Sequence, residues 1–207
     1  MSQVTTGIRS ILSSAGAYNL VQTLMGAHKG RTYFANTHIR ANAGARVLDI
    51  GCGTSEILGY LPKVDYVGFD ISPDYIAAAK SKYGNRGVFH SKLLTESEVD
   101  AMQRFDIVLA IGLLHHMDDD AACNFIALAR RALAPGGRLV TIDGCFVKGQ
   151  NPIARFIISR DRGQNIRTPE GYASLASSNF TSINTTLRHV PWIPYTHWIM
   201  ECNNTDR

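Results

Sequence analysis

The most specific pattern in this chain is Val47-Leu48-Asp49-Ile50-Gly51-Cys52-Gly53-Thr54. Its apolar residues predict a short buried β-strand over 45–50, because an apolar run of this length bounded by glycine is typical of a strand in a parallel sheet. Gly51 and Gly53 follow directly, and glycine lets the backbone turn sharply and approach a bound molecule closely. The pattern therefore predicts a strand that ends in a ligand-binding turn.

A second apolar strand, over 66–69, ends at Asp70, which follows Asp49 by 70 − 49 = 21 residues. In a Rossmann-like sheet, an acid at this offset accepts hydrogen bonds from ribose hydroxyls. The turn lacks the third glycine of the dinucleotide fingerprint, because Glu56 occupies that position. Asp49 would also repel a pyrophosphate and attract a cation. The site thus suits a ligand with a ribose and a positive charge, and S-adenosylmethionine (SAM) has both.

Three segments resemble, in the same order, motifs of the class I (Rossmann-like) SAM-dependent methyltransferases. Residues 47–53 resemble their first motif, 105–116 their fourth-strand motif, and 133–140 the turn into their fifth strand. The resemblance covers residues 46–143, and the flanks on either side are similar only in length and pattern. It implies an α/β fold, a Rossmann-like three-layer sandwich whose seven-stranded sheet is mostly parallel, with a C-terminal antiparallel hairpin.

Capping residues, glycine and proline mark the ends of the predicted elements. Ser72 is an N-cap residue, Pro73 suits the first helical position, and Asp74 suits the positive end of the helix dipole. Strands alternate with helices, which predicts βαβ units. The predicted strands span 45–50, 66–69, 88–90, 105–111, 138–143, 181–188 and 196–202. The predicted helices span 55–61, 73–83 and 118–131, and one or two more are expected within 144–178.

Length and composition narrow the class of protein. The 207 residues suit one domain, predicted over 1–207, with an N-terminal helical lid over 1–40 and a substrate-side insert over 144–178. The net charge of +4 is too small to indicate a nucleic-acid partner. The four cysteines lie far apart without a C-x-x-C motif, which favours a cytoplasmic location over a disulfide framework. No apolar run approaches the roughly 18 residues of a membrane span, and no pattern indicates an oligomeric state.

The resemblance assigns cofactor contacts to residues at the strand ends. Asp49 is expected to face the ammonium group of SAM and Asp70 the ribose hydroxyls, with Ile71 packed on the adenine. Without the resemblance, an acid at a strand end is more often a helix cap. The family's acidic residue after the third strand is absent, because the chain there runs His90-Ser91-Lys92-Leu93. The predicted cofactor-binding residues are Asp49, Gly51, Gly53, Asp70, Ile71, Leu93, Ala110 and Gly112.

The pair His115-His116 follows the predicted fourth strand and supplies the candidate catalytic residues. Histidine has a pKa near neutrality and suits a general base that removes a proton from an alcohol or phenol. Alternatively, one ring packs under a helix and the other bonds to a loop. The three acids over 118–120 are better explained as a helix start than as metal ligands, so we predict no metal.

Two tyrosines and a group of arginines are candidate substrate contacts. Tyr18 and Tyr195 are each expected at the mouth of the pocket or in the core. Guanidinium groups bind phosphate and carboxylate, so Arg160 and Arg162 would suit an anionic acceptor, unless they lie on a solvated helix face.

The predicted function is transfer of the methyl group of SAM to an O, N or C nucleophile of a small-molecule acceptor. Two alternatives stay open: an RNA or protein methyltransferase, and a catalytically silent SAM-binding protein. An Asn/Asp-Pro-Pro-aromatic motif, typical of enzymes that methylate amino groups of bases, is absent after the fourth strand, where the chain runs Ile111-Gly112-Leu113-Leu114-His115. The acceptor itself is not indicated by the sequence.

Overall fold

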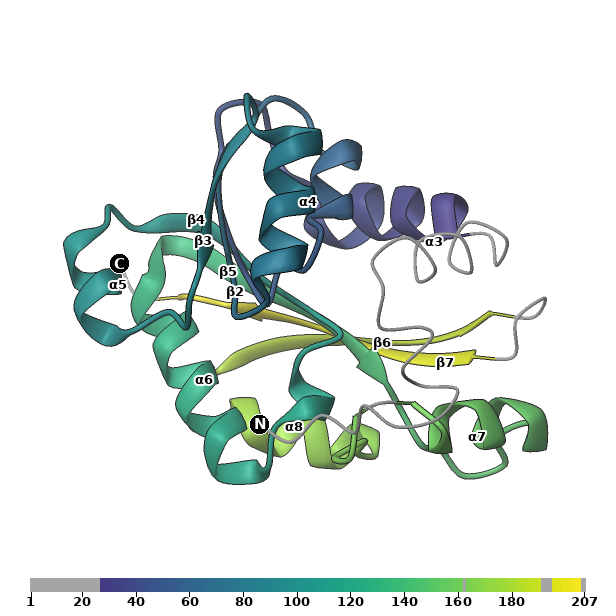
Figure 1. Ribbon diagram of the computed structural model, residues 1–207. Helices are drawn as coiled ribbons and strands as arrows, with labels where there is room; N and C mark the ends of the chain where they lie inside the picture. The colour runs from purple at the N-terminus through teal and green to yellow at the C-terminus, as the bar shows by residue number, and fades with distance from the viewer. Residues whose placement is uncertain (1–26, 162, 191–194, 206–207) are drawn as a thin grey trace. The chain divides into compact units, whose positions relative to one another are not determined.

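The computed structural model describes residues 27–161, 163–190 and 195–205 (Figure 1). The strands of this part of the chain form one seven-stranded sheet in the order β3-β2-β1-β4-β5-β7-β6. The strands are β1 (Arg46–Ile50), β2 (Asp65–Asp70), β3 (Gly87–Ser91), β4 (Phe105–Ile111), β5 (Leu133–Gly144), β6 (Ser182–Val190) and β7 (Tyr195–Asn203).

The sheet has a parallel part and an antiparallel part. Strand β1 pairs in parallel with both β2 and β4, and β2 pairs in parallel with β3. Strand β7 runs antiparallel to both β5 and β6. This arrangement confirms the predicted Rossmann-like α/β fold with a C-terminal antiparallel hairpin.

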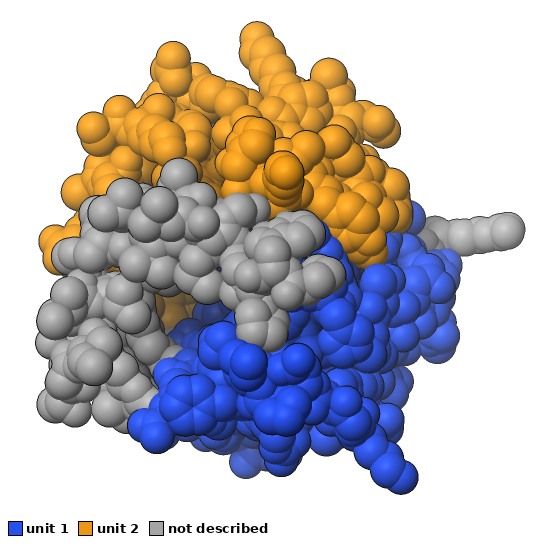
Figure 2. Space-filling model, turned by 90° about the vertical axis from the view of Figure 1, so that its right-hand side faces the viewer, with its two compact units in different colours: residues 1–3, 110–207 blue, residues 4–109 orange. Residues whose placement is uncertain are grey.

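The described residues fall into two compact units that meet in the sequence at β4 (Figure 2). Unit 2 ends at Leu109, and unit 1 resumes at Ala110. Unit 2 contains the glycine turn with Asp49 and Asp70, and unit 1 contains His115 and His116.

The described part of unit 2 holds β1 to β3 and five helical segments. These segments are α3 (Ala27–Phe34), the π-helix η1 (Ala35–Ile39), the 3₁₀ helix η2 (Glu56–Tyr60), α4 (Pro73–Tyr83) and α5 (Glu96–Ala101). Helix α4 packs against β2 and β3 and begins as predicted, because the Ser72 side chain accepts a hydrogen bond from the Tyr75 N–H at 3.3 Å. Helix α5 was not predicted, although Thr95 and Glu98 form the capping box of a helix start.

Unit 1 holds β5 to β7, the 3₁₀ helix η3 (Leu114–His116), and the helices α6 (Asp119–Ala132), α7 (Pro152–Ser159) and α8 (Pro169–Ser177). Helix α6 begins where the acidic run predicted it, with Asp118 accepting a hydrogen bond from the Ala121 N–H at 2.9 Å. Helices α6 and α8 pack against each other, and α6 also packs against β5 and α8 against β6 and β7 (Figure 1).

Strand β5 begins at Leu133, not at residue 138 as the Pro-Gly-Gly sequence predicted. Gly136 has a φ of +75°, and its N–H donates to the carbonyl of Asn204, whose own N–H donates to Gly137. The backbone that follows β7 therefore extends the pairing past the glycines, a contact between segments far apart in the sequence.

The predicted N-terminal lid over 1–40 is described only from residue 27 onwards, where the chain is helical. Tyr18 lies outside the described residues, as does Arg162. Within the described part, no helix is long and apolar enough to cross a membrane.

Candidate functional site

The turn after β1 has the backbone conformation that its glycines predict. Gly51 and Gly53 have φ values of +74° and +53°, a region that strains any residue with a Cβ. The N–H groups of Gly51 and Cys52 both donate to the carbonyl of Phe69, at 2.8 and 3.0 Å, which ties the turn to β2. A Cβ on Gly53 would meet no atom within 4 Å. Open space thus lies beside Gly53, and the backbone angle is the reason for a glycine there.

Asp70 connects this turn to the start of α4. Its Oδ2 accepts a hydrogen bond from the Gly53 N–H at 2.9 Å, and its Oδ1 accepts one from the Ser72 N–H at 2.8 Å. A carboxylate oxygen can accept two hydrogen bonds, so each oxygen keeps capacity for a hydroxyl of a ligand. Asp70 therefore both shapes the turn and offers acceptors beside it.

Asp49 lies at the end of β1 and is 1% exposed. The hydroxyl of Tyr66 donates to its Oδ2 at 2.6 Å, whereas its Oδ1 has no hydrogen-bond partner among the described residues. Burial raises the pKa of Asp49 to about 7, the Tyr66 hydrogen bond opposes that rise, and the charge of Asp70 adds to it. A cation placed at Oδ1 would stabilise the ionised form of this carboxyl.

Two exposed apolar side chains stand at the ends of neighbouring strands of unit 2. Ile71 follows β2 and is 51% exposed, and Leu93 follows β3 and is 59% exposed. Asp70 and Ser91 are partners in the β2–β3 register, so the two strands end side by side. Exposed apolar side chains beside Asp70 suit a flat apolar ring.

The other two predicted cofactor residues, Ala110 and Gly112, belong to unit 1. Ala110 is fully buried. Gly112 has a φ of +64°, and its N–H donates to the carbonyl of Ile142 at 2.8 Å. Both are small, as predicted, and the angle at Gly112 favours glycine.

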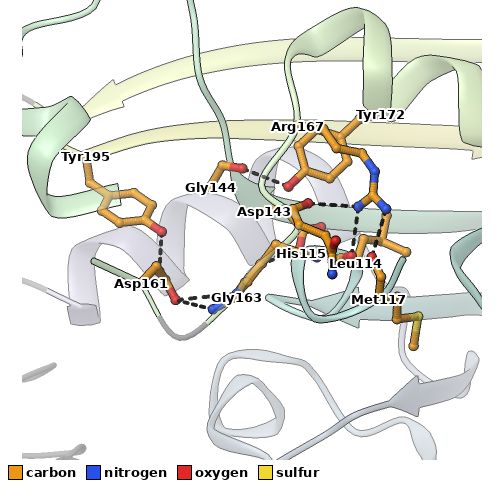
Figure 3. A network of polar contacts seen from close by, with 11 residues as sticks. Leu114, His115, Met117, Asp143, Gly144, Asp161, Gly163, Arg167, Tyr172 and Tyr195 are labelled. Carbon is orange, nitrogen blue, oxygen red and sulfur yellow. Dashed lines mark hydrogen bonds and ion pairs between the residues drawn. The ribbon is translucent and has the colours of Figure 1, made fainter. Parts of the chain in front are cut away.

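A partly buried ion-pair network centres on His115 in unit 1 (Figure 3). His115 Nδ1 lies 2.8 Å from Asp143 Oδ1, and its Nε2 lies 3.6 Å from Asp161 Oδ1. The hydroxyl of Tyr195 donates to Asp161 Oδ2 at 2.6 Å. The imidazole therefore stands between two carboxylates, and Tyr195 reaches it through the second of them. We call these four residues, His115, Asp143, Asp161 and Tyr195, the His115 network.

The charges in this network shift the pKa values of its members. Burial lowers the pKa of His115, but the hydrogen bonds and negative charges of Asp143 and Asp161 outweigh it and raise that pKa to about 9. Burial acts to raise the pKa of Asp161, but the charge and hydrogen bonds of His115 and Tyr195 bring it below its usual value. At neutral pH the ring is therefore a cation beside at least one carboxylate.

Residues 163–167, between α7 and α8, lie against η3 and the ring of His115. A Cβ on Gly163 would overlap the ring of His115. Arg167 donates to the carbonyls of Leu114 and Met117, at 3.0 and 2.8 Å (Figure 3). It also donates to Asp119 Oδ1 at 2.8 Å. Arg167 thus holds the segment against η3.

The structure brings only part of the predicted substrate set together. Tyr195 joins the network, and the half-buried His116 has its ring centroid 4.3 Å from that of His115. Arg160 is exposed at the end of α7, with its guanidinium 5.2 Å from the ring centroid of Phe156. Among the described residues, no group of three or more His, Cys, Asp or Glu side chains is arranged to hold a metal ion.

Sequence reasoning missed Asp143 and Asp161 as partners of His115. Asp143 is the last residue of the predicted strand 138–143. Functional groups often lie at the ends of strands in such sheets, and this rule could have found it. Asp161 carried no such signal, because it sits in an irregular segment and its partner Tyr195 is 34 residues away.

Comparison with known proteins supports the predicted family. Residues 48–139 match the family described as "Methyltransferase domain". The chain is similar to the ubiquinone biosynthesis O-methyltransferase of Bradyrhizobium sp. (strain ORS 278), with 36% identity over 102 residues, 47% of this chain and 39% of that protein. It is also similar to the ubiquinone/menaquinone biosynthesis C-methyltransferase of Burkholderia orbicola (strain MC0-3), with 30% identity over 153 residues, 69% of this chain and 61% of that protein.

A solved structure supports the fold over almost the whole chain. The N-methyltransferase NodS from Bradyrhizobium japonicum WM9, in complex with S-adenosyl-L-homocysteine, superposes with a TM-score of 0.72 at 15% identity, over 95% of this chain and 96% of that one. By contrast, the chain spans about two fifths of the length of the O-methyltransferase above. The strand order, the glycine turn with its acids, and the match over residues 48–139 agree: the chain has a Rossmann-like methyltransferase fold, and residues 48–139 are similar to the methyltransferase-domain family.

Proposed function

We propose that this protein is a SAM-dependent methyltransferase that methylates an O, N or C atom of a small-molecule acceptor. The observation that carries the proposal is the turn at Gly51 and Gly53 together with the acids Asp49 and Asp70. The turn permits close approach of the backbone, and the acids offer acceptors for a cation and for hydroxyls. A dinucleotide suits this site less well, because Asp49 opposes a pyrophosphate.

Each residue of this set is proposed to hold one part of the cofactor. Asp49 would accept a hydrogen bond from the ammonium group at Oδ1, and Asp70 would accept hydrogen bonds from the ribose hydroxyls. Ile71 and Leu93 would cover the adenine, and their exposed positions support this role. SAM supplies a methyl group on a positively charged sulfur, which a positioned nucleophile can take. Ala110 and Gly112, in unit 1, stay proposed cofactor contacts.

We propose that the His115 network, His116 and Arg160 lie on the acceptor side of the reaction. Because the pKa of His115 is raised to about 9, its ring is protonated at neutral pH and cannot accept a proton there. A base role for His115 therefore requires a rate that rises with pH through about 9. A positioning role requires no such rise, and methyl transfer then rests on proximity, which can supply most of the rate.

The relatives do not share one kind of methyl acceptor. The relatives and the solved structure named above are an O-, a C- and an N-methyltransferase, so the fold accepts all three kinds of acceptor atom. RNA or protein as acceptor is the second candidate, and a silent SAM-binding protein the third. The small net charge of +4 supports a small molecule over RNA. The four free thiols support a reducing, cytoplasmic location.

Ligand binding tests the cofactor first. SAM and S-adenosylhomocysteine should raise the melting temperature, because a ligand that binds the native state stabilises it, and NAD should not. A rise with NAD and none with either SAM form would contradict the proposal.

Product analysis tests the acceptor. The protein is incubated with methyl-labelled SAM and a metabolite extract, and the label is located by mass spectrometry. A new labelled small molecule is expected, and Asp70→Ala serves as the cofactor-binding control that should not produce it. Label in RNA or protein would select the second candidate. Cofactor binding without any labelled product would select the third.

A further inference from the structure

We propose that Tyr66 is a positioning residue of the cofactor site, whose hydroxyl holds the Asp49 carboxylate so that Oδ1 receives the ammonium group of the bound cofactor. The inference rests on the proposed function and deepens it. It assigns a task to a core tyrosine and predicts that cofactor affinity depends on pH.

Tyr66 reaches Asp49 diagonally across two strands. In the β1–β2 register Tyr66 is the partner of Val47, and Asp49 lies two residues further along β1 on the same face. The Tyr66 hydroxyl nevertheless comes within 2.6 Å of Asp49 Oδ2. A ring that extends along the sheet by two residues needs neighbouring residues with small side chains.

Two glycines beside the Tyr66 ring leave this space. A Cβ on Gly68 would stand 3.1 Å from Tyr66 Cε1, and one on Gly87 would stand 2.8 Å from Tyr66 Cδ1. Phe89 packs on the same ring, with the two centroids 5.8 Å apart. Tyr66 is 1% exposed. The backbone at Gly68 on β2 and at Gly87 on β3 and the side chain of Phe89 on β3 therefore confine the ring, whose hydroxyl meets Asp49.

The consequence for Asp49 is a carboxylate with one oxygen bound and one open. Tyr66 is the single hydrogen-bond donor to Asp49 in the described residues, and Oδ1 is buried without a partner. A buried acceptor left without a donor is costly, so this atom is suited to a donor that arrives with a ligand. An ammonium group is both a donor and a cation, which the negative cluster of Asp49 and Asp70 favours.

Protonation of Asp49 competes with that ammonium group. With a pKa of about 7, Asp49 is ionised in about one tenth of molecules at pH 6 and nine tenths at pH 8. The affinity for a cationic ligand should therefore rise about tenfold between these pH values. Removing the Tyr66 hydroxyl removes a hydrogen bond that lowers the pKa, which should raise it by about one to two units.

The experiment compares two ligands and two matched variants by calorimetry. S-adenosylhomocysteine carries the ammonium group, and 5′-methylthioadenosine carries the same nucleoside without it. We expect Tyr66→Phe to weaken S-adenosylhomocysteine binding by about 5- to 50-fold at pH 7 and to recover affinity at higher pH, with 5′-methylthioadenosine unchanged. Tyr83→Phe, a buried tyrosine on α4 in the same unit, should match the wild type with both ligands.

Each other result decides against the proposal. Unchanged S-adenosylhomocysteine affinity in Tyr66→Phe, or an equal loss for both ligands, would make Tyr66 a core residue only. If Tyr66→Phe does not fold, the wild type decides, because an S-adenosylhomocysteine affinity that is flat between pH 6 and 8 overturns the proposal. Failure of the wild type to bind either ligand would instead overturn the proposed function itself.

Discussion

Replacing His115 with glutamine should remove a pH-dependent part of the stability of unit 1. The pKa of His115 rises from 6.5 to about 9 on folding, because two carboxylates face its ring and outweigh the effect of burial. A group with a raised folded-state pKa stabilises the folded protein fully below pH 6.5 and loses that contribution as pH rises through 9. The window of the effect is therefore pH 6.5 to about 9.5.

The magnitude follows from the shift. A rise of 9 − 6.5 = 2.5 units corresponds to about 3 kcal/mol of unfolding free energy, at about 1.4 kcal/mol per unit. The side chain is only 8% exposed, so solvent screens the interaction weakly. In a protein of about 200 residues, 1 kcal/mol changes the melting temperature by about 2–4 °C. The difference in melting temperature between the wild type and His115→Gln should thus shrink by about 6–12 °C between pH 6.5 and about 9.5.

Melting curves followed by circular dichroism at half-unit steps from pH 6 to 10 measure this difference. Subtracting the variant from the wild type removes groups that titrate equally in both, among them the lower-titrating Asp49. His189→Gln, on β6 and outside the network, is the matched control and should run parallel to the wild type. Parallel curves for His115→Gln and the wild type would refute the reasoning, because they would mean that His115 is not held as a cation.

Three further substitutions test individual contacts. Gly163→Ala should destabilise the protein by about 1–3 kcal/mol in urea denaturation, because the added methyl overlaps the imidazole of the network, and a change under 0.5 kcal/mol would contradict this. Asp70→Ala should weaken SAM binding at least about tenfold in calorimetry. It should also lower the melting temperature, because the Gly53 and Ser72 N–H groups lose their acceptor. Weaker binding at unchanged stability would show that the turn does not need the Asp70 carboxylate. Arg167→Met should cost about 1–3 kcal/mol and speed proteolysis between α7 and α8, whereas an unchanged cleavage rate would show that the carbonyl contacts do not hold this segment.

Local patterns were sufficient for the parallel half of the sheet. The strand ending at Ile50, the glycine turn and the acid at Asp70 depend on residues close together in sequence, and glycine at positive φ is nearly obligatory in such a turn. The sequence signals for the starts of α4 and α6 were equally local, because each cap side chain accepts a hydrogen bond from an N–H only three positions away. The helix α5 had the same kind of signal, in its capping box.

Only the tertiary structure decided which polar groups meet. The distances in sequence between Tyr66 and Asp49, between His115 and Asp143, and between Asp161 and Tyr195 are 17, 28 and 34 residues. The sequence by itself determined the fold class and the turn with its acids, because periodicity, glycine conformation and capping act over a few residues. Strand register, the direction of the Tyr66 ring and the path of the segment after α7 decided which groups meet. Burial then raised the pKa of Asp49 to about 7 against the Tyr66 hydrogen bond, and the two carboxylates raised that of His115 to about 9 against burial.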